Sequence, residues 1–340
     1  MPAMKASIII PCWNSETTLE RCLACVRAQT LVDFEAIFVD DGSTDGTSRI
    51  LAGAAAQDER FRVITQENRG VSAARNAGLD AARGEFIFFV DPDDAFSSEM
   101  LARGVAAMES EDSDYCVFPY REKYEDEAEF HQIPLKGTCR YASNDEIVSN
   151  YMSRMFGYSA EQVRAWYHGM PLQAHRVQGG VCWCVYRRSL IEARHVRFDE
   201  RIALYEDALF NCEYMLGAAR MTCVEEPLYD YIHTRQGAIS RLRRGTYELT
   251  NKLELLRKRK ELDAATGGRL LSMYECSCVF SLLEMLKIVL TWRAPFWSGM
   301  RLVNAYGRDS VVRGSLKKFP LSMRHPVLAL AVLALRMRFG

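Results

Sequence analysis

The first 120 residues alternate short apolar runs with segments whose apolar residues recur every three or four positions. Short apolar runs beside turn-forming residues are typical of strands, and the longer period is typical of helices. The pattern predicts strands at 8–10, 36–39, 62–65, 85–90 and 115–119. It predicts helices at 17–28, from a cap at Ser43 or Thr44 to about 57, at 71–83 and at 98–109. Regular alternation of this kind indicates an α/β domain with a largely parallel sheet.

The alternation stops at residues 121–175, which are acidic at the start, rich in Tyr and His, and without a clean period. We interpret this segment as a variable excursion that contains some helix. The pattern then predicts a strand at 181–187, a helix at 207–216 and a strand at 228–233. From 245 onward it is helical. We therefore expect one α/β domain over residues 1–240 and a helical region over 241–340.

The composition is that of an ordinary globular protein, with 49% apolar and 26% charged residues among 340. A net charge of −1 gives no reason to expect binding to nucleic acid. Only three consecutive aliphatic residues, Ile8 to Ile10, precede Pro11, which is too few for a secretory signal peptide. We therefore expect a cytoplasmic protein whose eleven scattered cysteines are reduced thiols rather than disulfides or zinc ligands.

Polar or turn-forming residues follow each of the first four predicted strands. They are Pro11–Asn14, Asp40–Gly42, Asn68–Gly70 and Asp91–Asp94. In open α/β sheets, ligands bind outside the carboxyl ends of the strands. We expect these four loops to line one crevice.

Two carboxylates, Asp91 and Asp93, stand two residues apart in the fourth loop, where both can reach a hard divalent cation. A metal there would neutralise a diphosphate and stabilise its charge as it leaves. Arg75, near the start of a helix, can add a cation on the other side, or it can form a surface salt bridge. Asp93 or Asp94 can alternatively cap the following helix.

Taken together, these stretches resemble family 2 of the inverting glycosyltransferases, which have the GT-A fold. The matching blocks are SIIIPCWN (7–14), VDDGSTDGT (39–47), QENRGVSAARNAG (66–78), FIFFVDPDD (86–94) and YEDALF (205–210). The resemblance implies a catalytic domain over 1–240, with 176–240 on the acceptor side. It also implies transfer of a sugar from a nucleotide-diphosphate donor, with UDP expected, to an acceptor hydroxyl of a glycan or a lipid-linked molecule.

The resemblance also assigns roles to individual residues. Pro11, Trp13 and Asn14 would border the base and ribose, with Trp13 at a position where the family more often has Tyr. Asp41 would accept a hydrogen bond from uracil, and Asn68 and Arg75 would help to hold the nucleotide. Asp91 would lie by the ribose or the metal, and Asp93 would bind Mn²⁺ or Mg²⁺. Asp207 would be the catalytic base, and its neighbour Glu206 would either assist or only favour the helix dipole.

One block departs from the family. Many relatives carry Trp followed by a basic residue before a sequence like Tyr186–Arg188, but here Cys184 follows Trp183. Trp183 can form an acceptor platform by stacking on a sugar face, or it can be a buried core residue.

Three other functions are weighed against this one. A sugar-phosphate nucleotidyltransferase should have a glycine-rich, basic loop after the first strand, and residues 11–16 contain no glycine and no cation. A dinucleotide dehydrogenase is disfavoured because no G-x-G-x-x-G follows that strand. A nucleotide-sugar-binding scaffold without activity remains open, although Asp41, Asp93 and Asp207 are all present.

The charge of the chain is unevenly distributed. Residues 293–340 carry nine Lys and Arg but one acid, Asp309, so this segment has a charge of +8 and residues 1–292 have −9. The same segment contains Phe296, Trp297, Phe319 and the apolar run 327–335, but no run long enough to span a bilayer. We expect it to rest on the anionic inner face of the cytoplasmic membrane. Alternatively, its helices pack on the α/β domain and its cations are simply solvated.

Overall fold

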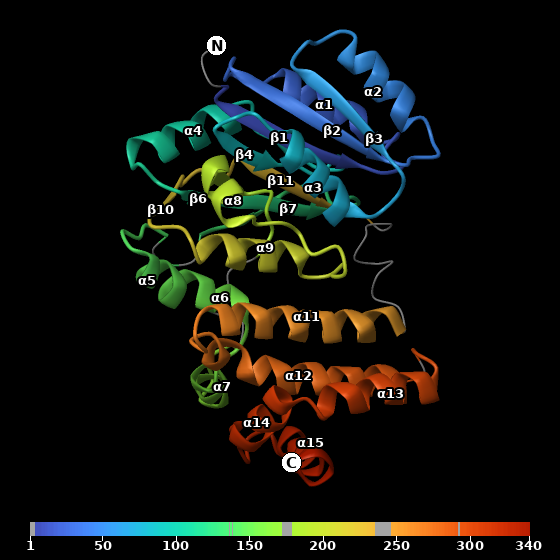
Figure 1. Ribbon diagram of the computed structural model, residues 1–340, viewed down its shortest axis with the longest axis vertical. Helices are drawn as coiled ribbons and strands as arrows, with labels where there is room; N and C mark the ends of the chain where they lie inside the picture. The colour runs from blue at the N-terminus through green and yellow to red at the C-terminus, as the bar shows by residue number, and fades with distance from the viewer. Residues whose placement is uncertain (1–3, 136, 138, 172–178, 235–245, 292) are drawn as a thin grey trace. The chain divides into compact units, whose positions relative to one another are not determined.

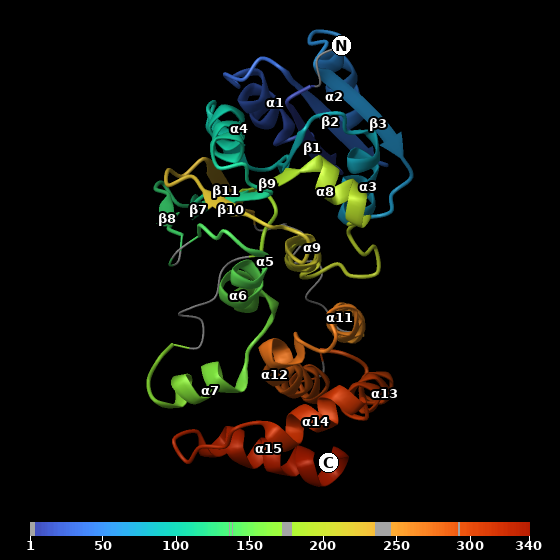
Figure 2. The same ribbon diagram turned by 60° about the vertical axis from the view of Figure 1, so that its left-hand side comes forward.

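The computed structural model describes residues 4–135, 137, 139–171, 179–234, 246–291 and 293–340 (Figures 1 and 2). The chain divides into two compact units. The first comprises Met1–Tyr151 and Gln178–Gly237, and the second comprises Met152–Val177 and Ala238–Gly340. Residues 121–175 are therefore shared between the two units, and the second unit is built from two separate segments of the chain.

A seven-stranded sheet in the order β10-β6-β9-β4-β1-β2-β3 forms the centre of the first unit. Its strands are β1 (Ala6–Cys12), β2 (Phe34–Asp41), β3 (Phe61–Gln66), β4 (Phe86–Phe89), β6 (Tyr115–Val117), β9 (Cys184–Arg187) and β10 (Met221–Cys223). The strands β3, β2, β1 and β4 run parallel, as do β6 and β10. Only β9 runs against its neighbours, between β4 and β6. The prediction of a largely parallel sheet is confirmed.

Helices flank this sheet on both faces (Figure 1). They are α1 (Leu19–Arg27), α2 (Thr47–Ala55), α3 (Val71–Ala81), α4 (Met100–Ser110), α8 (Arg188–Arg194) and α9 (Glu206–Met215). A short α5 (Asn144–Glu146), bonded through Asn144 to the carbonyls of Met215 and Ala218, leads into a π-helix at Ile147–Met152. Every residue of β1, β2 and β4 is buried, as expected for strands covered on both faces. Gly78 lets α3 lie against β1, because a Cβ there would stand 2.3 Å from Cγ2 of Ile9.

A second sheet of four strands, β5-β11-β7-β8, was not expected from the sequence. Its strands are β5 (Ala95–Phe96), β7 (Tyr120–Tyr124), β8 (His131–Ile133) and β11 (Tyr229–His233). Of these, only β11 lies in a segment for which the pattern predicts a strand. β11 pairs in parallel with β7 and antiparallel with β5, so it joins the start of the variable segment to the loop after β4.

One predicted cap is wrong. The N-cap of α2 is Gly46, and neither Ser43 nor Thr44 takes that position. Both residues bond to Asn14 instead. Ser43 Oγ accepts a hydrogen bond from the N–H of Asn14, and the N–H of Thr44 donates to Asn14 Oδ1. These bonds tie the loop after β2 to the loop after β1.

The second unit is helical. It contains α6 (Ser153–Phe156), α7 (Ala160–Tyr167), α11 (Thr246–Ala265), α12 (Leu271–Leu290), α13 (Phe296–Gly307), α14 (Ser310–Lys318) and α15 (Pro326–Phe339). The inserted helices α6 and α7 pack on the C-terminal ones. The ring of Phe156 meets Tyr274 edge-on at 5.3 Å, Trp166 stacks on His325 at 4.2 Å, and the Tyr167 hydroxyl donates to the carbonyl of Pro320. Within the described ranges, no helix is both long and apolar enough to cross a bilayer.

Candidate active site

The loops after β1, β2 and β3 meet at the carboxyl edge of the parallel strands. Pro11 lies buried in β1, Trp13 is 44% exposed, and Asn14 adopts a positive φ of 50°. Asparagine tolerates this left-handed conformation better than most residues. The hydrogen bonds of Asn14 to the Ser43–Thr44 loop hold the backbone there, and Trp13 next to it stays open to solvent.

Asp41, at the end of β2, is buried and holds the loop that precedes α3. Its Oδ1 accepts from Gln66 Nε2 at 2.7 Å and from the N–H of Arg69 at 2.9 Å, and its Oδ2 accepts from the N–H of Gly70 at 2.8 Å. Gly70 has a φ of 90°, which favours glycine. Because each carboxylate oxygen can accept two hydrogen bonds, Oδ2 retains the capacity for one more.

Asn68 is exposed in the same loop and packs closely on the end of β2. A Cβ at Gly42 would lie 2.8 Å from the backbone nitrogen of Asn68, so only glycine fits there. The structure thus brings Trp13, Asn14, Asp41 and Asn68 to one edge of the sheet.

Arg75 on α3 lies within ion-pair distance of three acids, Asp91, Glu206 and Asp207. Its side chain is only 3% exposed, and its Nη2 lies 3.0 Å from Asp91 Oδ1. Its Nη1 lies 2.6 Å from Asp207 Oδ1 and 3.5 Å from Glu206 Oε1. The guanidinium therefore joins the loop after β4 to the first turn of α9, two elements more than 100 residues apart in the chain.

The backbone at the start of α9 is conformationally unusual. Tyr205 precedes Glu206 with a φ of 73°, in the left-handed region that a bulky residue rarely adopts. Its own side chain is 54% exposed. The turn places Glu206 and Asp207 in the first turn of the helix, where the helix dipole favours negative charge.

The two acids of this turn have different proton affinities. Burial and the neighbouring charge of Asp207 raise the pKa of Glu206 to about 8. Burial also raises the pKa of Asp207, but the adjacent Arg75 acts in the opposite direction through its charge and its hydrogen bond. Arg75 thus favours the ionised form of Asp207, whereas burial and the charge of Asp207 favour the protonated form of Glu206.

The three acids after β4 have distinct environments. Asp94 is fully buried and does not cap α4, whose N-cap is Glu99. Instead its Oδ2 accepts from the Tyr229 hydroxyl at 2.6 Å and its Oδ1 accepts from the N–H of Ile232 at 2.8 Å. The Tyr229 oxygen in turn accepts from the N–H of Asp91, so β11 anchors this loop.

Asp91 and Asp93 are the other two acids of this loop, and Asp91 binds Arg75. Burial and the charge of Asp91 raise the pKa of Asp93 to about 6, because two carboxylates so close together resist ionising at the same time. Carboxylate oxygens at such spacing suit Mg²⁺ or Mn²⁺. No group of three or more His, Cys, Asp or Glu converges on one point in the described segments.

Trp183 lies just before β9 and stacks on Tyr120, with ring centroids 4.1 Å apart and planes inclined by 14°. It also meets Tyr229 and Tyr231 edge-on. Cys184 is buried beside the Tyr115 hydroxyl. One face of the Trp183 ring is therefore already covered by Tyr120.

Two residues of this site, Tyr205 and Tyr229, were not found from the sequence. The alternation of Tyr229, Tyr231 and His233 could have marked one face of a strand. It carries no indication that Tyr229 reaches the loop after β4. Nothing in the pattern signals the left-handed conformation of Tyr205.

Comparison with known proteins places this site in context. Residues 7–171 match the family model described as Glycosyl transferase family 2. The chain is 34% identical to EpsJ of Bacillus subtilis (strain 168) over 225 residues, which are 66% of this chain and 60% of EpsJ. It is 30% identical to EpsH of the same organism over 279 residues, which are 77% of this chain and 74% of EpsH. Both relatives are named as glycosyltransferases.

A similar fold occurs in S. aureus TarS. The crystal structure of its residues 1–349 in complex with UDP-GlcNAc has a TM-score of 0.63 and 21% sequence identity, over 98% of this chain and 89% of that one.

Proposed function

Because the chain belongs to glycosyltransferase family 2, we propose that it transfers one sugar from a UDP-linked donor to an acceptor hydroxyl, with inversion at the anomeric carbon. The observation that carries the proposal is the contact of Arg75 with both Asp91 and Asp207, which joins the proposed base to the loop that contains the two potential metal ligands. The complex of TarS with UDP-GlcNAc supports the choice of donor class.

Asp207 is the proposed base. An inverting transfer needs one carboxylate to take the proton of the acceptor hydroxyl as its oxygen attacks the anomeric carbon. The new C–O bond forms as the bond from that carbon to the diphosphate oxygen breaks, and UDP leaves with the bonding electrons. Glu206 is unsuited to be the base because its pKa of about 8 keeps it protonated near neutral pH.

Arg75 has a positioning role in this proposal rather than direct contact with the nucleotide. It holds Asp207 in one orientation and lowers the free energy of its ionised form. Because the same guanidinium binds Asp91, it also fixes the distance between the base and the diphosphate side.

Asp91 and Asp93 would hold Mn²⁺ or Mg²⁺, which when bound neutralises the diphosphate and stabilises the charge on the leaving UDP. The nucleoside would lie on the loops after β1 to β3. There Asp41 Oδ2, which accepts one hydrogen bond from Gly70, would accept a second from the uracil N–H, and Pro11, Trp13, Asn14 and Asn68 would border the base and ribose.

Trp183 and the tyrosines around it would form the acceptor side. The ring face opposite Tyr120 would be the one to stack on a sugar. We place the acceptor among glycans and lipid-linked saccharides, as used in the synthesis of cell-surface polysaccharides.

Release of UDP tests the transfer. Purified protein with Mn²⁺ and a panel of UDP-sugars should hydrolyse or transfer at least one donor, and an α-linked donor should give a β-linked product by NMR. Excess EDTA should abolish the reaction, and Asp93→Ala should do the same in a folded protein. Full activity in EDTA would refute the metal role, and failure of every nucleotide sugar to be turned over would favour an inactive scaffold.

We further propose that the protein works at the inner face of the cytoplasmic membrane. On α15, Val327, Leu330, Leu333 and Met337 are 80%, 67%, 41% and 86% exposed. Their spacing of three or four residues makes one apolar stripe, in a segment with a charge of +8. Such a helix can lie in the headgroup region of an anionic bilayer.

Flotation with vesicles tests this location. The protein should bind vesicles that contain phosphatidylglycerol but not those of phosphatidylcholine alone, and high salt should release it. Leu330→Asp with Met337→Asp should weaken binding, because both charges would enter the apolar stripe. Equal recovery of unbound protein with both vesicle types at low salt would rule the location out.

A further inference from the structure

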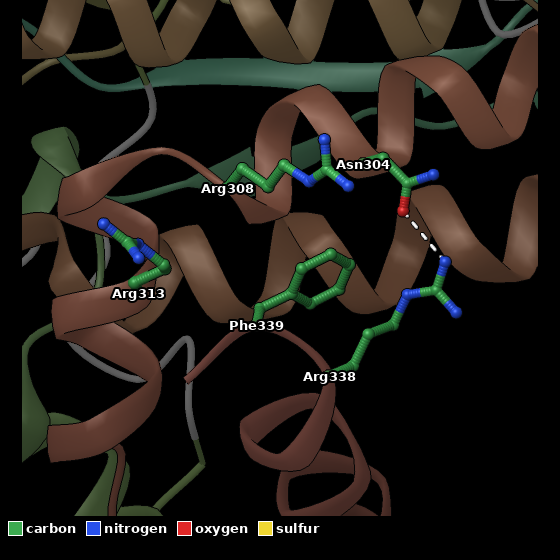
Figure 3. Close-up of a pocket in the computed structure, with 5 residues that line it drawn as sticks. All are labelled: Asn304, Arg308, Arg313, Arg338 and Phe339. Atoms are coloured by element: carbon green, nitrogen blue, oxygen red, sulfur yellow. Dashed lines mark hydrogen bonds between the residues drawn. The ribbon is translucent and has the colours of Figure 1, made fainter.

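An open pocket with a volume of about 560 Å³ lies in the second unit, where α13, α14 and α15 come together. The residues that line it are Asn304 on α13, Arg308 just after α13, Arg313 on α14, and Arg338 and Phe339 at the end of α15. In Figure 3 the side chains of Arg308, Asn304, Arg338 and Phe339 lie near one another, and the guanidinium of Arg313 is turned to the other side. Three of its five lining residues are therefore arginines.

These arginines are not neutralised by the protein. Within the described part of the chain, no carboxylate lies within 4.0 Å of Arg308, Arg313 or Arg338. Arg338 donates to Asn304 Oδ1 at 2.9 Å, and its guanidinium also lies over the Phe339 ring. The nearest acid in sequence, Asp309, is engaged elsewhere, because it binds Lys260 at 2.6 Å and caps α14.

Other arginines of this unit contrast with the three in the pocket. Arg257 pairs with Glu254, Arg293 pairs with Glu248, and Arg336 donates to the carbonyls of Leu316, Lys317 and Phe319. The positive charges of those side chains are therefore already bound to acids or carbonyl groups of the protein. Positive charges that line one pocket without a counter-charge favour the binding of an anion there.

The pocket suits a phosphate group. Guanidinium groups present a planar fork of N–H donors that matches the oxygens of phosphate, and such charge-assisted bonds are among the strongest that side chains make. The volume lies in the range of small-molecule sites, so it is large enough for a phosphate together with part of the group esterified to it. The Asn304 amide nitrogen is a further donor, and Phe339 offers one apolar wall.

We propose that this pocket is a binding site for a phosphate ester, separate from the site of sugar transfer. The proposal does not depend on the transfer reaction, since none of the five lining residues belongs to the first unit. The phosphate can belong to a soluble molecule or to a lipid headgroup, and the experiment below separates these two sources.

The first measurement is the affinity for glycerol 1-phosphate by isothermal titration calorimetry, in EDTA so that the Asp91–Asp93 loop holds no metal. Wild-type protein should bind one equivalent. The triple variant R308Q/R313Q/R338Q should lose affinity by at least about tenfold, because it removes three charge-assisted contacts.

A matched variant controls for net charge. R301Q/K317Q/K318Q also removes three positive charges from exposed positions of α13 and α14, none of which lines the pocket. It should keep the wild-type affinity. Thermal unfolding without ligand checks that both variants fold, and single Arg→Gln variants replace the triple one if it does not.

The second measurement is flotation of both triple variants with phosphatidylglycerol vesicles. If the pocket variant loses more vesicle binding than its control does, the ligand is a lipid headgroup. If both variants lose vesicle binding equally, and only the pocket variant loses glycerol 1-phosphate binding, the ligand is a soluble phosphate ester. If glycerol 1-phosphate does not bind the wild type, or binds both triple variants equally well, the pocket is no phosphate site.

Discussion

At the scale of single residues, the site depends on Arg75 and the acids it touches. Replacement of Asp207 by Asn keeps the size of the side chain and removes its ability to accept a proton. Turnover should fall by about 10²–10⁴, and the dissociation constant of the donor should change little. Donor affinity measured by calorimetry, together with single-turnover rates, separates the two effects.

A matched control for that variant is Asp80→Asn. Asp80 is an aspartate of the same unit whose side chain is 65% exposed and pairs with Arg197 on the surface. Its replacement should leave turnover unchanged. A collapse of donor binding in Asp207→Asn with normal turnover of bound donor would make Asp207 a binding residue instead of the base.

Glu206 should make the stability of the protein depend on pH. Its pKa in the folded protein is about 8, against an ordinary value of 4.5, so between these values the folded state keeps a proton that the unfolded state has lost. Stability must therefore fall as pH rises through this window, by up to about 1.4 kcal/mol per pH unit for this group. Glu206→Gln cannot ionise and should remove that part of the decline.

Urea unfolding of wild type and Glu206→Gln at several pH values between about 5 and 9 measures the difference. The two proteins should be closest in stability at the acid end, where Glu206 is protonated in the folded state, and the variant should be the more stable at the alkaline end. Parallel curves across the whole range would show that Glu206 is not held in its neutral form.

Several residues to which the family resemblance assigns roles lie close together in the fold. The blocks that resemble family 2 contain Asp41, Arg75, Asp91 and Asp207, and the fold brings these residues to one edge of the sheet. Arg75 was expected to hold the nucleotide, whereas here its N–H groups donate to Asp91 and Asp207. That pairing joins residues more than 100 positions apart, and no local pattern encodes it.

At the scale of elements, the hydroxyl of Tyr229 connects β11 to the loop after β4. Tyr229→Phe removes a buried donor from Asp94 and a buried acceptor from the Asp91 N–H. We expect a loss of about 1–3 kcal/mol in the free energy of unfolding. Because Asp91 and Asp93 belong to the loosened loop, the Mn²⁺ concentration needed for half-maximal activity should rise.

Tyr231→Phe is the corresponding control. Tyr231 lies two residues further along β11, and its hydroxyl makes no side-chain hydrogen bond with the described residues. Its replacement should change neither the free energy of unfolding nor the Mn²⁺ concentration needed for half-maximal activity by much. If the two variants have equal stability and equal metal dependence, Tyr229 does not anchor the metal loop.

The elements themselves were predictable in proportion to their regularity. The long periodic helices and the apolar strands β1 to β4 lie within a few residues of the predicted ranges, because burial on one or both faces leaves a clear pattern. The strands β5, β7 and β8 contain two, five and three residues. Segments so short have no measurable period, and they form only because β11 supplies a partner.

At the scale of the whole molecule, the inserted segment Met152–Val177 belongs to the second unit although first-unit residues flank it on both sides. Met155, Phe156, Val163 and Tyr167 bury their side chains in that unit. A chain cut after residue 237 would leave these groups without partners. It should aggregate and bind the dye ANS, because exposed apolar patches of this kind promote association.

A second truncated chain tests whether the apolar side chains of the inserted segment cause the aggregation. The same cut chain with residues 152–177 replaced by a Gly/Ser linker of equal length lacks the exposed apolar groups, and it should stay soluble and monomeric in gel filtration. If both truncated chains behave alike, the insert is not what makes the first one aggregate.

The antiparallel strand β9 also determines the order in which the protein can fold. It fills the place between β4 and β6, yet residues 90–183 lie between it and β4 in the chain. During synthesis, the Phe86–Phe89 strand can pair with β1 early, but its other edge has no partner until Arg187 has left the ribosome. Pairings between distant segments form slowly, and an unpaired apolar edge attracts other chains. The newly made chain should therefore depend on chaperones until its last central strand arrives.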